Sequence, residues 1–220
     1  MAPVLSGLIA AALAIGLVTG YHRPVPPEPK LGPKLPATEI AGDPPPARIA
    51  DLTVTHRVRR RTGIERQAPR PTQIRIPAIG VSARIVPLDL ARDGTMETPR
   101  RFSQTGWYRP GPEPGERGPA VIAGHVDSHT GPAVFFKLGQ LRRGDSIEIR
   151  RVNETVIHFT VQGLERWPKA SFPTKRVFGR TRGATLRLIT CSGDFNHATG
   201  HYEDDTIIYA VRRLRRQRRT

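Results

Sequence analysis

The sequence predicts a mainly all-β domain with a few short helices, and three observations support this. Apolar residues come in about eight short runs, several of which alternate with polar residues as in a half-buried strand. Glycine, proline and acidic or amide residues lie between the runs, where turns are expected. No long segment has the 3.6-residue periodicity of an amphipathic helix. Short strands at this spacing favour an antiparallel barrel or a sandwich.

The β-rich runs start at Gln73 and continue to Val211, which we take as the bounds of the domain. Gly144-Asp145 precedes one run, and Asn153-Glu154 is the turn that follows it. The expected strands lie at residues 74–76, 83–86, 120–123, 134–136, 146–150, 155–161, 186–191 and 206–210. Short helices are expected only around residues 99–105 and 169–177.

The residues before the domain divide into two segments. Residues 1–21 are mostly apolar with no charged side chain, which predicts a membrane anchor of about the minimum spanning length. A cleaved signal peptide is the alternative, although a basic start is missing. The basic residues that follow would keep that side of the membrane cytoplasmic. Residues 22–72 contain half of the 22 prolines and predict an extended linker.

The net charge of +16 is not concentrated in the predicted domain. Residues 73–211 carry nineteen Lys and Arg against fourteen Asp and Glu, whereas residues 212–220 form a basic tail with six Arg and no acid. Because no finger spacing, recognition helix or aromatic RNA-binding pattern is present, we expect no nucleic-acid partner. Basic tails also attract anionic wall polymers and lipid headgroups.

Cys191 is the only cysteine of the chain, and it ends a predicted strand before a loop at residues 193–202. Strand packing would fix its backbone while the loop leaves its face open, although a buried structural cysteine is the common alternative. His125 follows the apolar run at 120–123 and so also lies at a strand end. A nucleophilic cysteine needs a partner such as histidine, which is usually distant in sequence. The 66 intervening residues are consistent with such a pair.

Four segments together resemble a sortase: Ile76-Pro77-Ala78-Ile79-Gly80-Val81, Gly106-Trp107-Tyr108, Gly124-His125-Val126-Asp127 and Leu188-Ile189-Thr190-Cys191. The first segment and the loop Cys191-Ser192-Gly193-Asp194-Phe195 resemble the actinobacterial class E/F branch. The resemblance implies an eight-stranded sortase-type β-barrel on a membrane anchor, with the catalytic domain outside the cell. It also implies a transpeptidase that cleaves an LPXTG-like sorting signal between Thr and Gly through a thioacyl-enzyme. The acyl group would pass to an amine, by default that of a peptidoglycan precursor. Cys191 would be the nucleophile and His125 the acid and base.

One departure from the family concerns the positive charge. Sortases carry an Arg on the strand after the cysteine, which holds the scissile carbonyl, but residues 192–211 contain none. Arg187 shares the strand parity of Cys191, so we take it as the candidate oxyanion group, with a surface strand residue as the alternative. Asp127 is the candidate for orienting His125, or an exposed loop acid.

Two other functions compete with this interpretation. His125, Asp127 and His129, together with Cys191, His197 and His201, have the side chains of a zinc hydrolase, although their spacing matches no zinc signature. A non-enzymatic barrel that binds wall polyanions through its tails is the second. The favoured interpretation needs no metal or other cofactor. Trp107, Tyr108, Phe135 and Phe136 are expected in the core rather than in a peptide groove.

Overall fold

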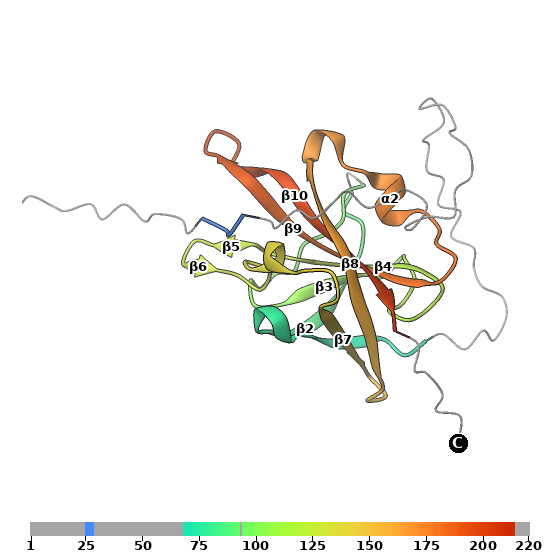
Figure 1. Ribbon diagram of the computed structural model, residues 1–220. Helices are drawn as coiled ribbons and strands as arrows, with labels where there is room; N and C mark the ends of the chain where they lie inside the picture. The colour runs from blue at the N-terminus through green and yellow to red at the C-terminus, as the bar shows by residue number, and fades with distance from the viewer. Residues whose placement is uncertain (1–24, 29–67, 93, 214–220) are drawn as a thin grey trace, which may run out of the picture.

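The computed structural model describes residues 25–28, 68–92 and 94–213, and the strands among them form a closed eight-stranded β-barrel (Figure 1). Neighbouring strands follow the order β1-β2-β3-β4-β9-β10-β8-β7, and β7 pairs with β1 to close the barrel. The barrel strands are β1 Pro71–Ile76, β2 Val81–Leu88, β3 Thr105–Tyr108, β4 Gly118–Gly124, β7 Ser146–Arg151, β8 Val156–Pro168, β9 Ala184–Asn196 and β10 His201–Arg212. The predicted all-β class is confirmed, and of the two predicted architectures, barrel and sandwich, the structure is a barrel.

The barrel is mixed, which corrects the expectation of a wholly antiparallel sheet. β2 pairs with β3 in parallel, and β4 pairs with β9 in parallel, while the other neighbours are antiparallel. The β4–β9 pair joins segments about 66 residues apart, and crossover connections of this kind are what parallel pairing requires. The two strands of a parallel pair run in the same direction, so β4 and β9 both run toward the same end of the barrel.

Seven of the eight expected runs lie in barrel strands, and the eighth strand is elsewhere. Residues 134–136 form a turn instead of a strand because Phe135 packs into the core from a loop, where it is wholly buried. The missing strand is β3, which begins where we expected a helix at 99–105; that segment consists of bends and turns. The second expected helical region is confirmed by the 3₁₀ helix η4 (Lys169–Ser171) and by α2 (Thr174–Phe178).

Further short elements connect the strands. They are the 3₁₀ helices η2 (Pro77–Ile79) and η3 (Leu138–Gln140), and a small two-stranded sheet of β5 (Asp127–Ser128) and β6 (Gly131–Pro132). Gly80, with φ of 69°, ends η2 and lets the chain turn directly into β2.

Alternate residues of the strands fill two separate apolar clusters. The inner cluster lies within the barrel and includes Trp107, Ile122, Leu186 and Leu188. The outer cluster lies on the other face of β4, β9 and β10, where Val177 of α2 covers it. Tyr108, Val121, Ile189, Ile207 and Tyr209 complete its buried members. The wall formed by β4, β9 and β10 is therefore covered on both faces, which explains the continuous apolar run at residues 120–123.

β9 continues past Cys191 to Asn196, which corrects the expectation that the strand ends at the cysteine. Only residues 197–200 form the connection to β10, so most of the predicted loop is a hairpin that extends from the barrel (Figure 1). Gly193 and Asp194 lie opposite the single residue Glu203, because the register shifts between Tyr202 and Asp204. Gly193 has φ of 80°, as the first residue of a glycine bulge does.

Residues 25–28 contact the barrel at one point, where Glu28 pairs with Arg166 of β8 at 3.0 Å. The predicted anchor, most of the linker and most of the basic tail lie outside the described residues. Within the described part of the chain, no helix combines the length and the apolar character that a membrane span needs.

Candidate active site

The parallel pairing of β4 with β9 brings His125 and Cys191 to the same level of the barrel. Ala123 is the partner of Ile189, and the Thr190 hydroxyl donates a hydrogen bond to the Gly124 carbonyl at 2.9 Å. The register offset is 66 residues, so continuing the ladder by two positions sets His125 beside Cys191. The two residues that the sequence predicts as a pair therefore come from neighbouring strands.

A second register places two more residues in the same row. Cys191 is the partner of Asp205 on β10, and Asp205 is the partner of Trp167 on β8. Residues that lie directly opposite one another in antiparallel strands point to the same face. Cys191 has the parity of Ile189, which belongs to the outer cluster, so the thiol lies on the outer wall of the barrel.

The Cys191 thiol is partly buried beneath the connection from β8 to β9, and Lys169 of that connection approaches it. The Lys169 ammonium donates to Cys191 Sγ at 3.5 Å. Burial raises the pKa of the Cys191 thiol, and the Lys169 ammonium opposes this rise. The carboxylates of Asp205 and Asp127 act in the same direction as burial. A cation beside a cysteine favours the thiolate, which is the nucleophilic form.

His125 is held by the segment between β2 and β3. Its Nε2 lies 2.7 Å from the Pro99 carbonyl oxygen, and the Phe102 ring packs against the imidazole with a centroid distance of 4.7 Å. A carbonyl oxygen only accepts, so Nε2 carries the hydrogen and donates it. Nδ1 is then the nitrogen that is free to exchange a proton with a substrate.

Asp127 lies two residues after His125, in β5, and is buried. Its carboxylate accepts a hydrogen bond from the Tyr202 hydroxyl at 2.8 Å. Tyr202 is the first buried residue of β10, so this bond ties the loop after β4 to the β9–β10 hairpin. The exposed-acid alternative for Asp127 is thereby wrong, while its role in orienting His125 stays a prediction.

Arg187 points to the same face as Cys191, as its parity predicts, but the structure does not bring its guanidinium to the thiol. The two residues are four positions apart on β9, a separation of roughly 13 Å between Cα atoms. The guanidinium is only 1% exposed, lies 4.8 Å from the centre of the Tyr209 ring and donates to the Leu186 carbonyl. The alternative that Arg187 is a surface residue is wrong. Its role as the oxyanion group stays a prediction, which the distance of Arg187 from Cys191 does not support.

The residues of the alternative zinc site are scattered. His129 lies in the turn between β5 and β6, whereas His197 and His201 are exposed at the far end of the β9–β10 hairpin. Within the described ranges, no three His, Cys, Asp or Glu side chains gather as metal ligands would. The fold therefore gives the zinc alternative no support.

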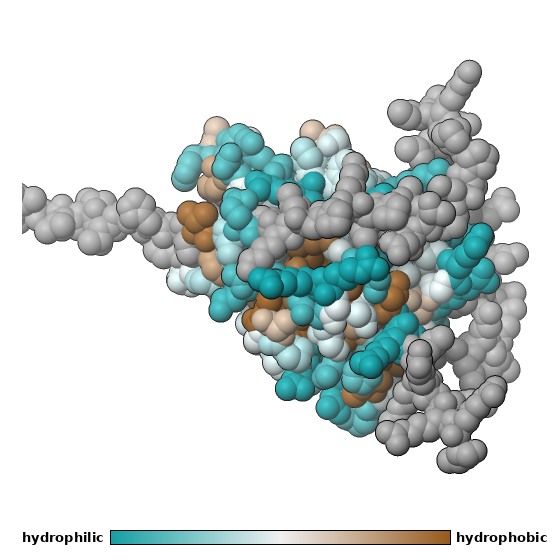
Figure 2. Space-filling model, in the orientation of Figure 1, coloured by the Kyte–Doolittle hydropathy of each residue, from teal (hydrophilic) through white to brown (hydrophobic). Residues whose placement is uncertain are grey.

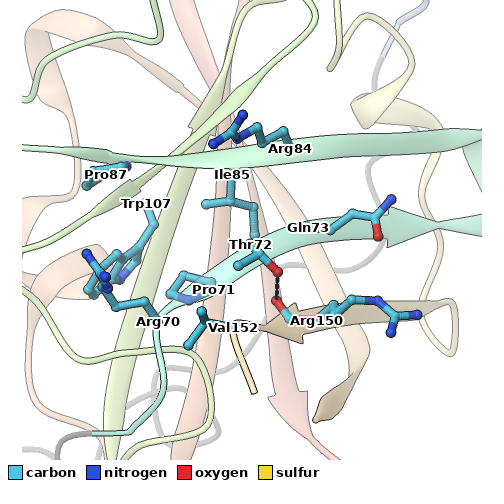
Figure 3. Close-up of a pocket in the computed structure, with 10 residues that line it drawn as sticks. All are labelled: Arg70, Pro71, Thr72, Gln73, Arg84, Ile85, Pro87, Trp107, Arg150 and Val152. Atoms are coloured by element: carbon cyan, nitrogen blue, oxygen red, sulfur yellow. Dashed lines mark hydrogen bonds between the residues drawn. The ribbon is translucent and has the colours of Figure 1, made fainter. Parts of the chain in front are cut away.

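A cavity of about 580 Å³ lies away from Cys191, at the other end of the barrel. Its lining comes from the start of β1 and from the end regions of β2, β3 and β7, which is the end opposite to the ends of β4 and β8. In Figure 3, the Thr72 hydroxyl bonds the Arg150 carbonyl, and the Arg150 side chain points away from Trp107. The lining contains no cysteine, histidine or carboxylate, so we place the site at Cys191 and not at this cavity.

The molecular surface gives no competing site on the face that Figure 2 shows. Hydrophilic residues dominate that face, and hydrophobic residues are visible only in small separate areas. Of the large apolar side chains described, only Val25, Leu90, Phe102 and Val152 are strongly exposed. Of these four side chains, Phe102 contacts His125. Phe102 is 42% exposed, so an exposed apolar side chain lies beside the candidate site.

Sequence reasoning missed Lys169 and Asp205. Lys169 lies 22 residues before Cys191 in an irregular connection, where no periodicity predicts its direction. Asp205 lies opposite Cys191 because of the bulge at Gly193, which a simple count back from the turn does not reveal. The glycine itself is the one available signal, since an isolated glycine within a β-run indicates a bulge.

Comparison with known proteins agrees with this arrangement. The sortase domain family matches residues 74–213. Sortase A from Corynebacterium diphtheriae, solved as a lid mutant, aligns with a TM-score of 0.53 at 21% identity over 69% of this chain and 74% of its own. Sortase C-1 from Actinomyces oris aligns with a TM-score of 0.52 at 22% identity over 65% and 73%. No curated protein sequence matches the chain.

The solved structures share the fold, at identities too low to transfer more than that. The family match covers well over half of the 220 residues and includes every barrel strand except the first three residues of β1. The protein is therefore a member of the sortase family, the cysteine transpeptidases of the cell envelope.

Proposed function

We propose that this sortase cleaves an LPXTG-like sorting signal between Thr and Gly, with Cys191 as nucleophile and His125 as acid and base. The observation that supports the assignment is the register of β4 and β9, whose continuation past Ala123 and Ile189 pairs position 125 with position 191. Family membership supports the reaction type, and the positions of Cys191 and His125 support their roles as nucleophile and as acid and base.

The reaction proceeds in two halves. The Cys191 thiolate attacks the Thr carbonyl carbon, and the C–N bond breaks as protonated His125 gives its proton to the departing Gly amine. The product is a thioester between the Thr carbonyl and Cys191. An amine acceptor then loses a proton to His125 and attacks the thioester, which releases the thiolate and forms a new amide bond. There is no net oxidation or reduction, and the proton that His125 takes from the acceptor amine replaces the one that it gave to the departing Gly amine.

The hydrogen bond from His125 Nε2 to Pro99 supports this role for the imidazole. It holds the ring in one orientation through both halves of the reaction, because Nε2 donates to a carbonyl whether the ring is neutral or charged. The protons that move are then those at Nδ1.

Two finer assignments belong to the same proposal. The Ile76-Pro77-Ala78-Ile79-Gly80-Val81 opening and the residues after Cys191 favour the class E/F branch. We also infer that residues 1–21 anchor the chain in the membrane, which their apolar composition supports. Family membership favours a barrel outside the cell, against the basic residues that follow the segment. The acceptor amine is that of a peptidoglycan precursor.

The test uses purified protein, a quenched LPXTG-type peptide library and an added amine. We expect cleavage that stops with Cys191→Ala and falls by about 10²–10⁴-fold with His125→Ala. A mass measurement that detects the peptide joined to the amine separates transpeptidation from hydrolysis. His129→Ala, which changes a nearby exposed histidine, is the matched control and keeps full activity. Unchanged cleavage by the Cys191→Ala protein would refute the assignment.

A further inference from the structure

The β8–β9 connection brings one cationic side chain, that of Lys169, to the Cys191 thiol. β8 ends at Pro168, and the next residue, Lys169, begins η4 and directs its ammonium to Cys191 Sγ at 3.5 Å. Lys169 is exposed along most of its length, so the connection and not a packed core sets its position. The contact is charge-assisted, and such contacts are the stronger hydrogen bonds.

An acid occupies the strand position beside the nucleophile. The strand after Cys191 contains no Arg before Arg212, and Asp205 is the residue directly opposite Cys191. Burial raises the pKa of Asp205 to about 6, and the neighbouring Asp204 carboxylate acts in the same direction. Lys169 opposes both effects, so its ammonium interacts with the carboxyl group as well as with the thiol.

The two nearest arginines are engaged elsewhere. The Arg187 guanidinium lies over Tyr209. Arg166 has the opposite strand parity to Trp167 and binds Asp204 at 2.7 Å and Glu28 at 3.0 Å. Lys169 is therefore the cationic side chain that the described structure brings to the sulfur.

We propose that Lys169 supplies the positive charge that acts on Cys191, and that Asp205 competes with the thiolate for this one ammonium. The proposal rests on the transpeptidase function above and names the residue that replaces the missing arginine. The oxyanion formed when the thiolate attacks is two bonds from Sγ, which is within reach of the same ammonium. Lys169 thus stabilises the thiolate first and the tetrahedral intermediate next.

The groups that face the thiol define how the competition depends on pH. The groups that act on the charge of the thiol are Lys169 from η4, Asp205 from β10 and Asp127 from β5, and His125 follows β4 at the register position of Cys191. Asp205 in turn interacts with Lys169 and Asp204. Above pH 6 the Asp205 carboxylate is charged, draws on the ammonium and disfavours the thiolate. Below this pH it is neutral, and Lys169 interacts with the sulfur alone. Asp205 therefore lowers the reactivity of the thiol at neutral pH.

The test measures the alkylation of the full chain by iodoacetamide from pH 6 to pH 11.5, a range that includes the raised pKa of the thiol. Because Cys191 is the only cysteine, the rate reports on this thiol without any peptide substrate. We expect Lys169→Gln to move the midpoint of the profile upward by about one pH unit, Lys169→Arg to restore it, and Asp205→Asn to move it downward. Lys175→Gln in α2 is the matched control, since it changes the same residue type in the same connection.

A profile that Lys169→Gln leaves unchanged, or that Lys175→Gln moves equally, would overturn the proposal. Circular dichroism spectra verify that each variant is folded. The oxyanion role has its own readout at pH 8, where the Lys169 ammonium is charged. There, the single-turnover acylation rate divided by the thiolate fraction from the alkylation profile is still about 10²–10³-fold lower in Lys169→Gln. Equal values of this ratio in the two proteins would remove that role. Failure of the transpeptidase function would instead appear as an inactive wild-type protein whose alkylation profile still responds to Lys169.

Discussion

The Asp205 carboxyl group lowers the stability of the folded protein at neutral pH. Its pKa is raised to about 6 from an ordinary value of 3.8, chiefly by burial, so the folded state binds a proton more tightly than the unfolded state does. Its stabilising contribution is therefore present below pH 4 and lost as the pH rises through 6. The cost arises at the residue that faces the nucleophile, where selection for function tolerates it.

Asp205→Asn should raise the melting temperature at pH 8 and leave it almost unchanged at pH 4. The amide has a similar shape but does not ionise, so it removes the cost of burying a charge. Thermal unfolding followed by circular dichroism at the two pH values checks this. Asp194→Asn, at an exposed position of the same hairpin, is the control and shifts neither value. A lower melting temperature at pH 8 would mean that the electrostatic attraction of Lys169 for the carboxylate outweighs burial.

Arg187→Met should leave the reactivity of the Cys191 thiol unchanged, because the guanidinium lies over Tyr209 and not at the sulfur. Two of its nitrogens, Nε and Nη2, are buried without a hydrogen-bond partner among the described residues. A methionine of similar length removes this buried charge, which makes the change neutral or stabilising by about 1–4 kcal/mol. Urea unfolding and peptide cleavage check the two effects. Cleavage reduced by 10²–10³-fold in a stable protein would restore Arg187 as the oxyanion group.

At the scale of the element, the bulge at Gly193 determines which residue of β10 faces Cys191. With a positive φ, a side chain at this position is strained, and an added Cβ would lie 2.7 Å from the Asp204 carboxylate and 2.9 Å from the Arg166 guanidinium. Glycine is thus needed for two independent reasons. Without the bulge, the register from Asp204 onward would move by one residue, and Asp205 would turn to the other face.

Gly193→Ala should destabilise the fold by about 1–3 kcal/mol through backbone strain and displaced side chains. Urea unfolding measures this difference. Gly183→Ala is the matched control, since an added Cβ there meets nothing within 4 Å and no positive φ is involved. Equal stability of the two variants would show that the hairpin adjusts to the side chain without cost.

The sequence predicts the strands of this fold better than it predicts how they pair. Alternation locates β1, β2, β7 and the first half of β8 because one face of each is buried, and this pattern is local. β3 is missed because it has four residues, all buried, so it shows no alternation. The parallel pairing of β4 with β9 depends on a crossover of about 60 residues, which no local pattern specifies.

The same distinction applies to the candidate site. Cys191 and His125 are identifiable from residue type and from the motifs around them. The positions of Lys169 and Asp205 depend on an irregular connection and on a bulge, which tertiary contacts fix. The choice of Arg187 from strand parity gave the correct face, but parity carries no information on position along the strand.

Over the whole molecule, two clusters share one wall, so we expect them to unfold together. Trp107 belongs to the inner cluster and Trp167 packs against the outer one, and they are the only tryptophans of the chain. Trp107→Phe and Trp167→Phe each leave one fluorescent probe. For each variant, the urea transition followed by fluorescence should have the same midpoint as the transition followed by circular dichroism. An earlier fluorescence transition when Trp167 is the probe would mean that the β8–β9 connection opens before the barrel does.

The extension of β9 beyond β4 has one more consequence. The ladder toward β4 stops at Ala123 and Ile189, so among the described strands the stretch from Cys191 to Asn196 is paired on its β10 side alone. Its other margin is an open sheet edge, whose main-chain groups offer hydrogen bonds to any extended chain laid alongside. Cys191, the proposed nucleophile, is the first residue of this edge. A bound peptide can therefore be aligned by its backbone, whatever its side chains, before its carbonyl meets the sulfur.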